Sequence, residues 1–493
     1  MSDATTRSAS ALLAALEKRE TSSEELLRLF LARVERLSPG VNAVVTLDPD
    51  RALGEARRRD EERSRGDLRG PLHGLPVTVK DSFETEGLRT TSGGTPELMT
   101  HVPSRDADAV ARLRSAGAVV FGKTNLSTQA MDIQTYNAAF GTTANPWDAS
   151  RTAGGSSGGS AVAMSAGLSA LELGSDLGGS IRIPSAFCGV FGHRPSFGII
   201  PTRGHVPGPP GTLAAPDLET AGPIARAADD LDLAVRVLAG PDASHAVAFQ
   251  LRLPPPRRAS LRDYRLAAWL DDPAAAVDAA LRERLEAVVD ELRAAGAEVD
   301  TEARPGFSLA DNARLFMRVL YGSMAAGLPE GQFEKLRARA AALDPGDDSF
   351  RARLTRDTAQ THRDFELARE ARERRRARWA EFFTRFDALL CPVFPTPAFP
   401  HDQSPDFAKR TLAVNGVPEP YLGTLLGWPA LAGLASLPGT AAPVGFTADG
   451  LPAGIQVVGP FLEDRTAIHV AKLVAEVTGG YVVPPGLRDE PGV

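Results

Sequence analysis

The strongest constraint on the fold is a pair of segments rich in glycine and serine, residues 154–160 and 174–182, that bracket an apolar segment of small residues, 161–173. Glycine permits left-handed and closely packed backbone, so such turns can aim several N–H groups at one point, which suits an anion or a developing oxyanion. A flexible Gly/Ser linker is not followed directly by a buried apolar helix. A phosphate loop of the Walker type needs a lysine at its end, and this segment has none. We therefore expect a buried helix over 161–173 between two tight functional turns.

The remaining chain alternates helical and strand patterns. Residues 106–116 predict a helix closed by Gly117, followed by an apolar strand over 118–122; the pattern recurs as a helix over 276–295 stopped by Gly296 and a strand from 297 to 299. Such alternation is typical of α/β architecture. Further segments have the same character: helical periodicity over 8–65, a β-branched strand ending at Lys80, a buried strand over 388–392 and a closing helix over 463–475.

Residues 308–383 differ, because they are helical throughout and carry a dense basic run over 372–378. Acidic residues alternate with the arginines at a helical period, which indicates a solvated helix face rather than a nucleic-acid surface. We expect this segment to be a helical insertion.

Composition excludes several classes of protein. The 493 residues carry a net charge of −7, which argues against a surface built for nucleic acid or for anionic membrane. The two cysteines, Cys188 and Cys391, stand far apart without zinc-binding companions, so neither a disulfide framework nor a structural metal is predicted. Residues 1–20 lack the apolar core of a signal peptide, and we expect a cytoplasmic protein. The charge-free stretch 421–448 is interrupted by glycines and prolines, which predicts buried loops and short strands instead of a membrane helix.

Lysine usage singles out one candidate for proton transfer. Only six of the 55 basic residues are lysines. Chance explains most of these positions, but a site that needs an amine able to lose its proton cannot use arginine. Lys80, at the predicted end of a strand, is the candidate.

Two kinds of serine nucleophile fit the glycine-serine segments. The sequence around Ser157 matches the G-x-S-x-G pattern of a Ser-His-Asp hydrolase, although none of the downstream histidines has a distinguishing context. The Ser-x-x-Lys pattern of penicillin-binding enzymes is absent, because no lysine has a serine three positions before it. The other kind is a serine activated through a second serine by a neutral lysine.

The second kind is supported by a resemblance that covers nearly the whole chain. The sequence resembles the amidase signature family in ordered motifs: GPLHGLPVTVKD at 70–81, FGKTN at 121–125, NPW at 145–147, GGSSGGS at 154–160, GGSIRIP at 178–184, GPIAR at 222–226 and GLPAGIQ at 450–456. The resemblance implies a single domain over 1–493, an α/β fold with a large central mixed β-sheet and helices on both faces. It also makes the helical segment 301–384 a candidate cap.

Carried over residue by residue, the resemblance implies a catalytic triad. Ser180 is the nucleophile that becomes acylated, Ser156 is the bridging serine and Lys80 is the base. A cis peptide bond is expected between Gly155 and Ser156. The relay requires a pKa of Lys80 lowered from ~10.4 towards roughly 7–8. The oxyanion would bind the backbone N–H groups of this loop, which are those of Leu177, Gly178, Gly179 and Ser180.

Other residues have supporting or open roles. Met131 is a candidate for the acyl pocket, although a lone methionine is more often part of a core. Arg182 either binds an acidic substrate or pairs with Asp176 or Asp148. Lys123 and Asn125 are expected to brace the site. The sequence departs from the family pattern at Leu177, often Thr or Gln in relatives, and at His193, where leucine is usual; Leu177 suggests a less polar site.

The predicted activity is hydrolysis of the C–N bond of a carboxylic amide, with aryl amides, carbamates and esters as related substrates, and without metal or cofactor. The expected partner is a small-molecule amide, with no nucleic acid and no membrane, and a homodimer is allowed. Three alternatives stay open: an A-type amidotransferase component that works with a partner, the histidine-based hydrolase that uses Ser157, and a scaffold that has lost catalysis. Retention of Lys80, Ser156 and Ser180 argues against the scaffold.

Overall fold

The structure, a computed structural model, describes residues 4–206, 210–424 and 427–488. Its frame is an 11-stranded mixed sheet in which β2 runs parallel to β3 and β6, whereas β6 and β8, and β14 and β15, are antiparallel. Across the sheet the strands are β1 (Val44–Leu47), β3 (Val119–Thr124), β2 (Pro76–Lys80), β6 (Glu172–Asp176), β8 (Thr220–Ala225), β7 (Phe191–Arg194), β14 (Gly439–Phe446), β15 (Pro452–Val458), β11 (Ala388–Pro392), β9 (Arg265–Ala268) and β10 (Glu298–Asp300). Two small hairpins lie outside it: β4 (Tyr136–Asn137) with β5 (Gly141–Thr142), and β12 (Thr411–Val414) with β13 (Val417–Pro420).

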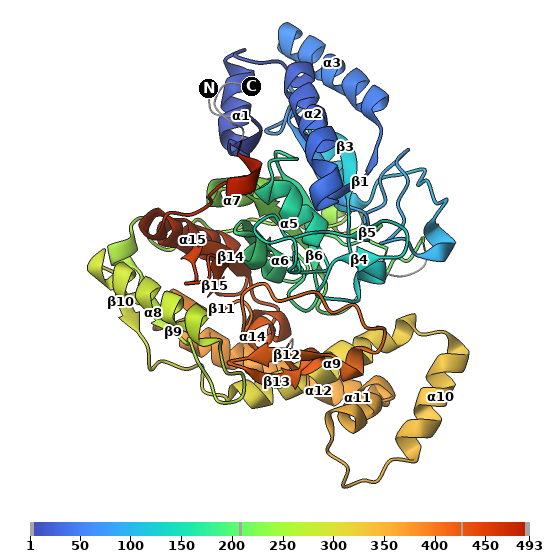
Figure 1. Cartoon of the computed structure of the whole chain (residues 1–493), viewed down its shortest axis with the longest axis vertical. Helices are drawn as coiled ribbons and strands as arrows, with labels where there is room; N and C mark the ends of the chain where they lie inside the picture. The colour runs from blue at the N-terminus through green and yellow to red at the C-terminus, as the bar shows by residue number, and fades with distance from the viewer. Residues whose placement is uncertain (1–3, 207–209, 425–426, 489–493) are drawn as a thin grey trace.

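Helices cover both faces of the sheet (Figure 1). On β14, Thr440 hydrogen-bonds His193, which in turn contacts Asp464 at the start of α15, whereas the adjacent Ala441 belongs to one apolar cluster with Ile183 of α6. Neighbouring residues of a strand point to opposite faces, so α15 and α6 lie on opposite sides. The predicted α/β class with helices on both faces is confirmed.

The helices of the structure are α1 (Ala9–Glu17), α2 (Ser23–Val41), α3 (Pro49–Arg65), α4 (Asp108–Ser115), α5 (Gly158–Ser165), α6 (Arg182–Cys188), α7 (Ala228–Leu238), α8 (Ala279–Ala294), α9 (Leu309–Met324), α10 (Glu330–Ala341), α11 (Phe350–Thr358), α12 (His362–Phe382), α13 (Tyr421–Thr424), α14 (Trp428–Leu434) and α15 (Asp464–Thr478). Over the ranges that the structure describes, no helix has both the length and the apolar character needed to cross a membrane.

Glycines mark the predicted helix-to-strand junctions. α4 ends before Gly117, at φ 94°, and α8 ends before Gly296, at φ 96°; β3 and β10 follow within two residues. These left-handed positions suit glycine, which has no Cβ to clash. The strand over 388–392 coincides with β11, and α15 begins within one residue of the predicted closing helix.

Three expectations were wrong in detail. The segment 161–173 is not one helix: α5 ends at Ser165, Gly167 takes a φ of 70°, and the chain enters β6 at Glu172. The stretch 421–448 contains two helices, α13 and α14, as well as β14. Pro429 does not prevent α14, because it lies in the first turn of this helix, where its missing N–H costs nothing. Residues 425–426 of this stretch lie outside the described part. The helical segment 8–65 also contains β1.

Helices α9 to α12 follow β10 and precede β11, and they gather at the end of the molecule opposite α1 to α3 (Figure 1). Phe316 of α9 shares a buried apolar cluster with Ala430 and Leu434 of α14, and Leu177 packs against the same cluster. Four helices, α9 to α12, lie within 301–384, and the description of this segment as an insertion and a cap stays a prediction.

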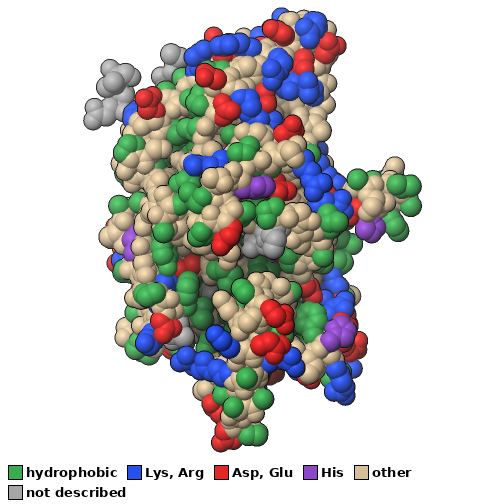
Figure 2. Space-filling view, turned by 90° about the vertical axis from the view of Figure 1, so that its right-hand side faces the viewer, with side chains coloured by type: hydrophobic (Ala, Val, Ile, Leu, Met, Phe, Trp, Pro, Cys, Tyr) green, Lys and Arg blue, Asp and Glu red, His purple; other side chains and the backbone are tan. Residues whose placement is uncertain are grey.

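Most of the basic run on α12 lies on a solvated helix face, as predicted, but Arg372 is buried and pairs with Asp217 at 2.6 Å. Arg374 pairs with Glu370 at 3.2 Å and Arg376 with Glu373 at 3.1 Å, so acids one turn away offset the arginines. Figure 2 shows the same mixture on a wider scale, with basic and acidic side chains interspersed over the visible face.

Candidate active site

Lys80 is the last residue of β2 and is fully buried. Its Nζ lies 2.6 Å from the Oγ of Ser156 and 2.9 Å from the Oγ of Ser175. Both nearest polar neighbours are neutral hydroxyl groups. The amine therefore has hydrogen-bond partners in its neutral form as well as in its charged form.

Burial lowers the pKa of Lys80 to about 7, because the ammonium form loses its hydration inside the protein. Three acidic residues, Glu219, Asp176 and Glu172, oppose this shift through their negative charge. A large fraction of the amine is thus neutral at physiological pH, which is the state that a general base requires.

The two serines of the predicted triad lie in the two glycine-serine turns. Ser156 precedes α5 and follows a cis peptide bond to Gly155, as the family resemblance implied. Ser180 lies in the loop between β6 and α6 and is partly exposed. The turns are joined through Ser157, whose N–H donates to the Ser180 carbonyl at 3.2 Å. Across the described chain, no hydrogen bond joins the hydroxyl groups of Ser156 and Ser180.

Asp176 organises the loop that carries Ser180. Its carboxylate contacts Arg182 at 2.9 Å and Arg194 at 3.3 Å, and it accepts hydrogen bonds from the N–H groups of Gly179 and Ile181. Burial on its own would raise the pKa of Asp176, but the two guanidinium groups hold it well below its usual range. Arg182 therefore pairs with Asp176, one of the two roles that the sequence left open.

The conformation of this loop limits which backbone N–H groups can donate to an oxyanion. The N–H of Gly179 is taken by Asp176 at 3.0 Å, which conflicts with its predicted role toward an oxyanion. Gly179 has a φ of 114°, and a Cβ at this position would lie 2.7 Å from Ile183, so the loop requires glycine here. The N–H groups of Gly178 and Ser180 have no acceptor within the described ranges and keep their predicted role.

Ser157 lacks the partner that a Ser-His-Asp mechanism needs. Its side chain is buried, and its Oγ donates to the carbonyl of Ser175 at 3.2 Å. No histidine contacts this hydroxyl among the residues that the structure places. This geometry counts against the histidine-based hydrolase.

Lys123 and Asn125 brace the surrounding loops. Burial lowers the pKa of Lys123 to about 8, and its Nζ donates to Phe83 O and, at 3.0 Å, to Thr90 Oγ1. Asn125 accepts from the N–H of Gly159 through its carbonyl at 3.1 Å. Met131 is 55% exposed, so it can touch a substrate only at an open rim, and its role in the acyl pocket stays a prediction.

The sequence analysis missed two polar groups at the site. Ser175 is the second neighbour of Lys80. Glu172 is buried, and its carboxylate accepts hydrogen bonds from Thr78 Oγ1 at 2.6 Å and from Thr124 Oγ1. Burial raises the pKa of this carboxyl to about 7. The available signal was an acidic residue, Glu172, between two leucines, Leu171 and Leu173.

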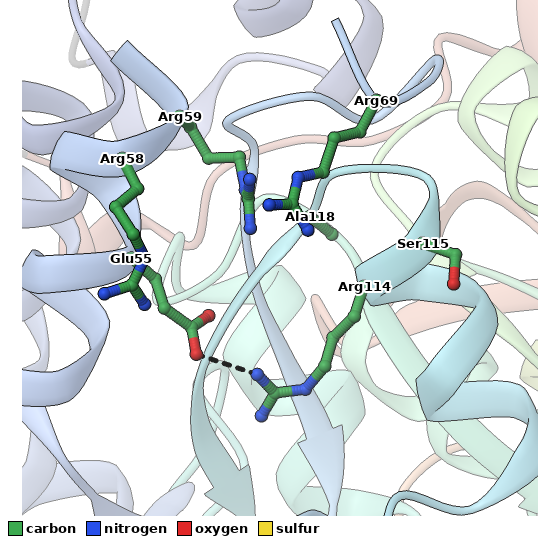
Figure 3. A pocket seen from close by; sticks show the side chains of 7 residues that line it. All are labelled: Glu55, Arg58, Arg59, Arg69, Arg114, Ser115 and Ala118. Atoms are coloured by element: carbon green, nitrogen blue, oxygen red, sulfur yellow. Dashed lines mark hydrogen bonds and ion pairs between the residues drawn. The ribbon is translucent and has the colours of Figure 1, made fainter. Parts of the chain in front are cut away.

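A separate cavity of about 320 Å³ lies near α3 and the start of β3, and arginines dominate its lining (Figure 3). Arg114 contacts Glu55 at 2.8 Å, as the dashed line shows, and Arg69 contacts Glu62 at 2.6 Å. Among the described residues of the lining, Ser115 is the one that carries a hydroxyl group, and neither lysine nor histidine accompanies it. The cavity therefore lacks the groups for acyl transfer.

Comparison with known proteins settles the family. The family model described as Amidase matches residues 25–468. The chain belongs to the amidase signature family.

The A-type component of the glutamyl-tRNA(Gln) amidotransferase of Roseiflexus sp. (strain RS-1) is 34% identical to this chain, over 97% of each protein. A solved amidase superposes with a TM-score of 0.78 at 29% identity, over 96% of this chain and 100% of its own. The peptide amidase of Stenotrophomonas maltophilia superposes with a TM-score of 0.74 at 28% identity, over 97% and 98%. The relatives of this amidase signature protein thus include both amidases and amidotransferase components.

Proposed function

We propose that the protein hydrolyses the C–N bond of a small carboxylic amide through an acyl-enzyme on Ser180. The observation that carries this proposal is the contact of 2.6 Å between the buried amine of Lys80 and the hydroxyl of Ser156. An amine whose pKa lies at about 7 can accept a proton at neutral pH.

The proton path follows from the order of the groups. Neutral Lys80 takes the proton of Ser156, and Ser156 takes the proton of Ser180 while the Ser180 oxygen attacks the carbonyl carbon. The N–H groups of Gly178 and Ser180 stabilise the oxyanion. The proton returns through Ser156 to the leaving nitrogen as the C–N bond breaks, and water then releases the acid from Ser180.

Labelling with a serine-reactive fluorophosphonate tests the assignment. We expect peptide-mapped mass spectrometry to find the adduct on Ser180 in the wild type and in the Ser157→Ala control, and to find little adduct in Lys80→Ala. A label on Ser157 would instead support a histidine-based hydrolase with Ser157 as the nucleophile. An unchanged labelling rate of Ser180 in Lys80→Ala would remove Lys80 from the mechanism.

A second candidate function is that of an amidotransferase component. Its support is the name shared by relatives with 31% and 34% identity over nearly the full length of the chain. Turnover of simple amides by the purified chain on its own favours the amidase. Amide hydrolysis that appears only with a partner protein favours the amidotransferase.

The environment of Leu177 favours an apolar substrate. Leu177 adjoins the loop of Ser180 and packs against a cluster that includes Phe316 and Leu218. We expect a panel of amides to show faster turnover for apolar acyl groups than for charged ones.

A further inference from the structure

The arginine-lined cavity near α3 combines buried and exposed residues in its lining. Its volume of about 320 Å³ is at the lower end of the roughly 300–1,000 Å³ that small-molecule pockets span. Arg59 and Ala118 are buried, whereas Arg58, Arg69 and Ser115 are exposed. The cavity is therefore open to a small solute and also has a buried, charged wall.

The four arginines of the lining come from three parts of the chain. Arg58 and Arg59 lie on α3, Arg69 lies in the loop before β2, and Arg114 lies in the last turn of α4. Figure 3 shows their side chains extending from different sides of the cavity. Guanidinium groups gathered in this way repel one another unless negative charge lies among them.

Carboxylates compensate this charge only in part. Three acidic residues contact the four arginines: Glu55, Glu62 and Asp106. A neighbouring ion pair, Arg51 with Asp48 at 3.6 Å, adds no net charge. The cluster thus has one positive charge in excess. Arg58 carries it, since this exposed side chain makes no hydrogen bond or ion pair with any residue that the structure describes.

Two buried guanidinium nitrogens of the cluster also lack a hydrogen-bond partner within the described ranges. They are Nε of Arg59, whose side chain is 7% exposed, and Nη2 of Arg114. A buried charged donor without an acceptor is unfavourable, and in native structures such a donor commonly faces a water or an ion. The free donors and the surplus charge both call for a ligand with negatively charged oxygen atoms.

A phosphate group matches this arrangement of donors. Guanidinium groups present a planar fork that bonds phosphate oxygens in pairs. A tetrahedral phosphate directs its oxygens to several sides at once, as the arginines from α3, α4 and the loop before β2 require, whereas a planar carboxylate offers two oxygens. The hydroxyl of Ser115 can donate one further hydrogen bond.

We propose that the cavity lined by Arg58, Arg59, Arg69, Arg114 and Ser115 is a binding site for a phosphate group, carried by free phosphate or by a small phosphate monoester. Its permanent positive charges attract the anion, and its buried donors hold the oxygens.

The site is separate from the proposed relay. His73 joins two of its arginines through their backbone, since its Nε2 lies 2.8 Å from the Arg59 carbonyl and its Nδ1 accepts from the N–H of Arg69 at 3.1 Å. His73 precedes β2, whereas Lys80 is the last residue of that strand. Bound phosphate therefore stabilises the junction of α3, β2 and α4 and takes no part in amide cleavage.

Isothermal titration calorimetry of the purified chain with inorganic phosphate, at pH 8 and constant ionic strength, tests the proposal. We expect saturable binding by the wild type. Arg58→Gln removes the surplus charge and leaves no buried carboxylate unpaired, so this variant should fold and bind phosphate about tenfold more weakly.

Arg339→Gln is the matched control. Arg339 is also an exposed arginine without a partner in the described part of the chain, and it lies on α10, at the end of the molecule opposite α3 (Figure 1). This variant should bind phosphate as the wild type does. Equal losses in Arg58→Gln and Arg339→Gln would reduce the effect to overall charge and overturn the inference.

Two more variants grade the contribution of the lining. Ser115→Ala removes a neutral donor and should weaken binding by only about threefold. Arg114→Gln should weaken it most, although it also leaves the carboxylate of Glu55 without its close partner, so circular dichroism checks its fold. If Arg114→Gln does not fold, the exposed positions Arg58 and Ser115 still decide.

The choice of anion distinguishes the sources of the phosphate group. Tighter binding of glycerol 3-phosphate than of inorganic phosphate assigns the site to a phosphorylated small molecule, and the reverse assigns it to free phosphate; both support the inference. Acetate should bind at least tenfold more weakly. Acetate binding as tight as that of phosphate, or no saturable binding of either phosphate compound, would overturn it. Fluorophosphonate labelling of Ser180, measured on the same samples, reports on the proposed function separately.

Discussion

Lys80 and the arginine-lined cavity of Figure 3 handle positive charge in opposite ways. Lys80 lies among hydroxyl groups, fully buried, with a pKa lowered to about 7. In the cavity, Arg114 faces Glu55 and Arg69 faces Glu62, so these guanidinium groups are paired with carboxylates. Only six of the 55 basic residues are lysines, and two of these six, Lys80 and Lys123, are fully buried at the site. Lys80 thus lies where the proposed relay must move a proton, whereas the cavity holds guanidinium groups whose charge is permanent.

The largest expected effect comes from exchanging the two kinds of cation at the site. Lys80→Arg keeps the positive charge but cannot lose its proton, so we expect kcat/KM for an amide substrate to fall by about 10²–10⁴-fold. Lys472→Arg, a surface lysine paired with Asp229, is the matched control and should keep wild-type activity. An active Lys80→Arg enzyme would contradict this comparison, because a cation that cannot lose its proton would then suffice at this position.

The pH dependence of the wild type should follow the lysine. Below a pH of about 7 the amine of Lys80 is protonated, so kcat/KM should fall about tenfold per pH unit on the acid side. A rate profile measured from pH 5 to 9 shows this limb. A profile that stays flat down to pH 5 would contradict a lysine base with a lowered pKa.

Removing the amine of Lys80 should abolish activity but raise stability. The unfolded chain holds the lysine proton up to its ordinary pKa of ~10.4, whereas the folded chain loses it near 7, so folding is penalised below that window and the penalty fades as pH rises through it. Lys80→Met removes this penalty. We expect the inactive variant to be more stable than wild type at pH 6, and its advantage to shrink by up to ~1.4 kcal/mol per pH unit between pH 7 and 10. Unfolding by denaturant at several pH values measures the difference, and an advantage that grows with pH would reverse the sign.

The smallest effect is expected in the cavity. Arg69→Lys keeps the charge opposite Glu62 at a site that is 46% exposed, so the free energy of unfolding should change by less than ~1 kcal/mol and activity should not change. Thermal unfolding and an amide assay measure both. A large loss of activity would give the cavity a part in the reaction.

Sequence reasoning reached the site because its residues stand in dense motifs. The position of Lys80 at a strand end and the two glycine-serine turns were readable from local pattern, and the resemblance supplied their roles. A hydrogen bond between Ser82 and His205 could not be read, because 123 residues separate its partners and His205 has no motif around it. The end of α5 was misplaced because the apolar pattern continues past Gly167 into β6 without a change of residue type. Local pattern thus finds elements and motifs, whereas pairing across the sheet depends on topology.

The order of strands has a consequence for how the protein is made. β7 and β11 are joined only through β14 and β15, which pair with them from near the C-terminal end of the chain. While the ribosome is still translating residues before 439, the two halves of the sheet have no strand between them, and each leaves an open edge that can pair with another chain. We therefore expect truncation before Gly439 to yield aggregated product, and the final fold to form only when the last pair of strands has emerged.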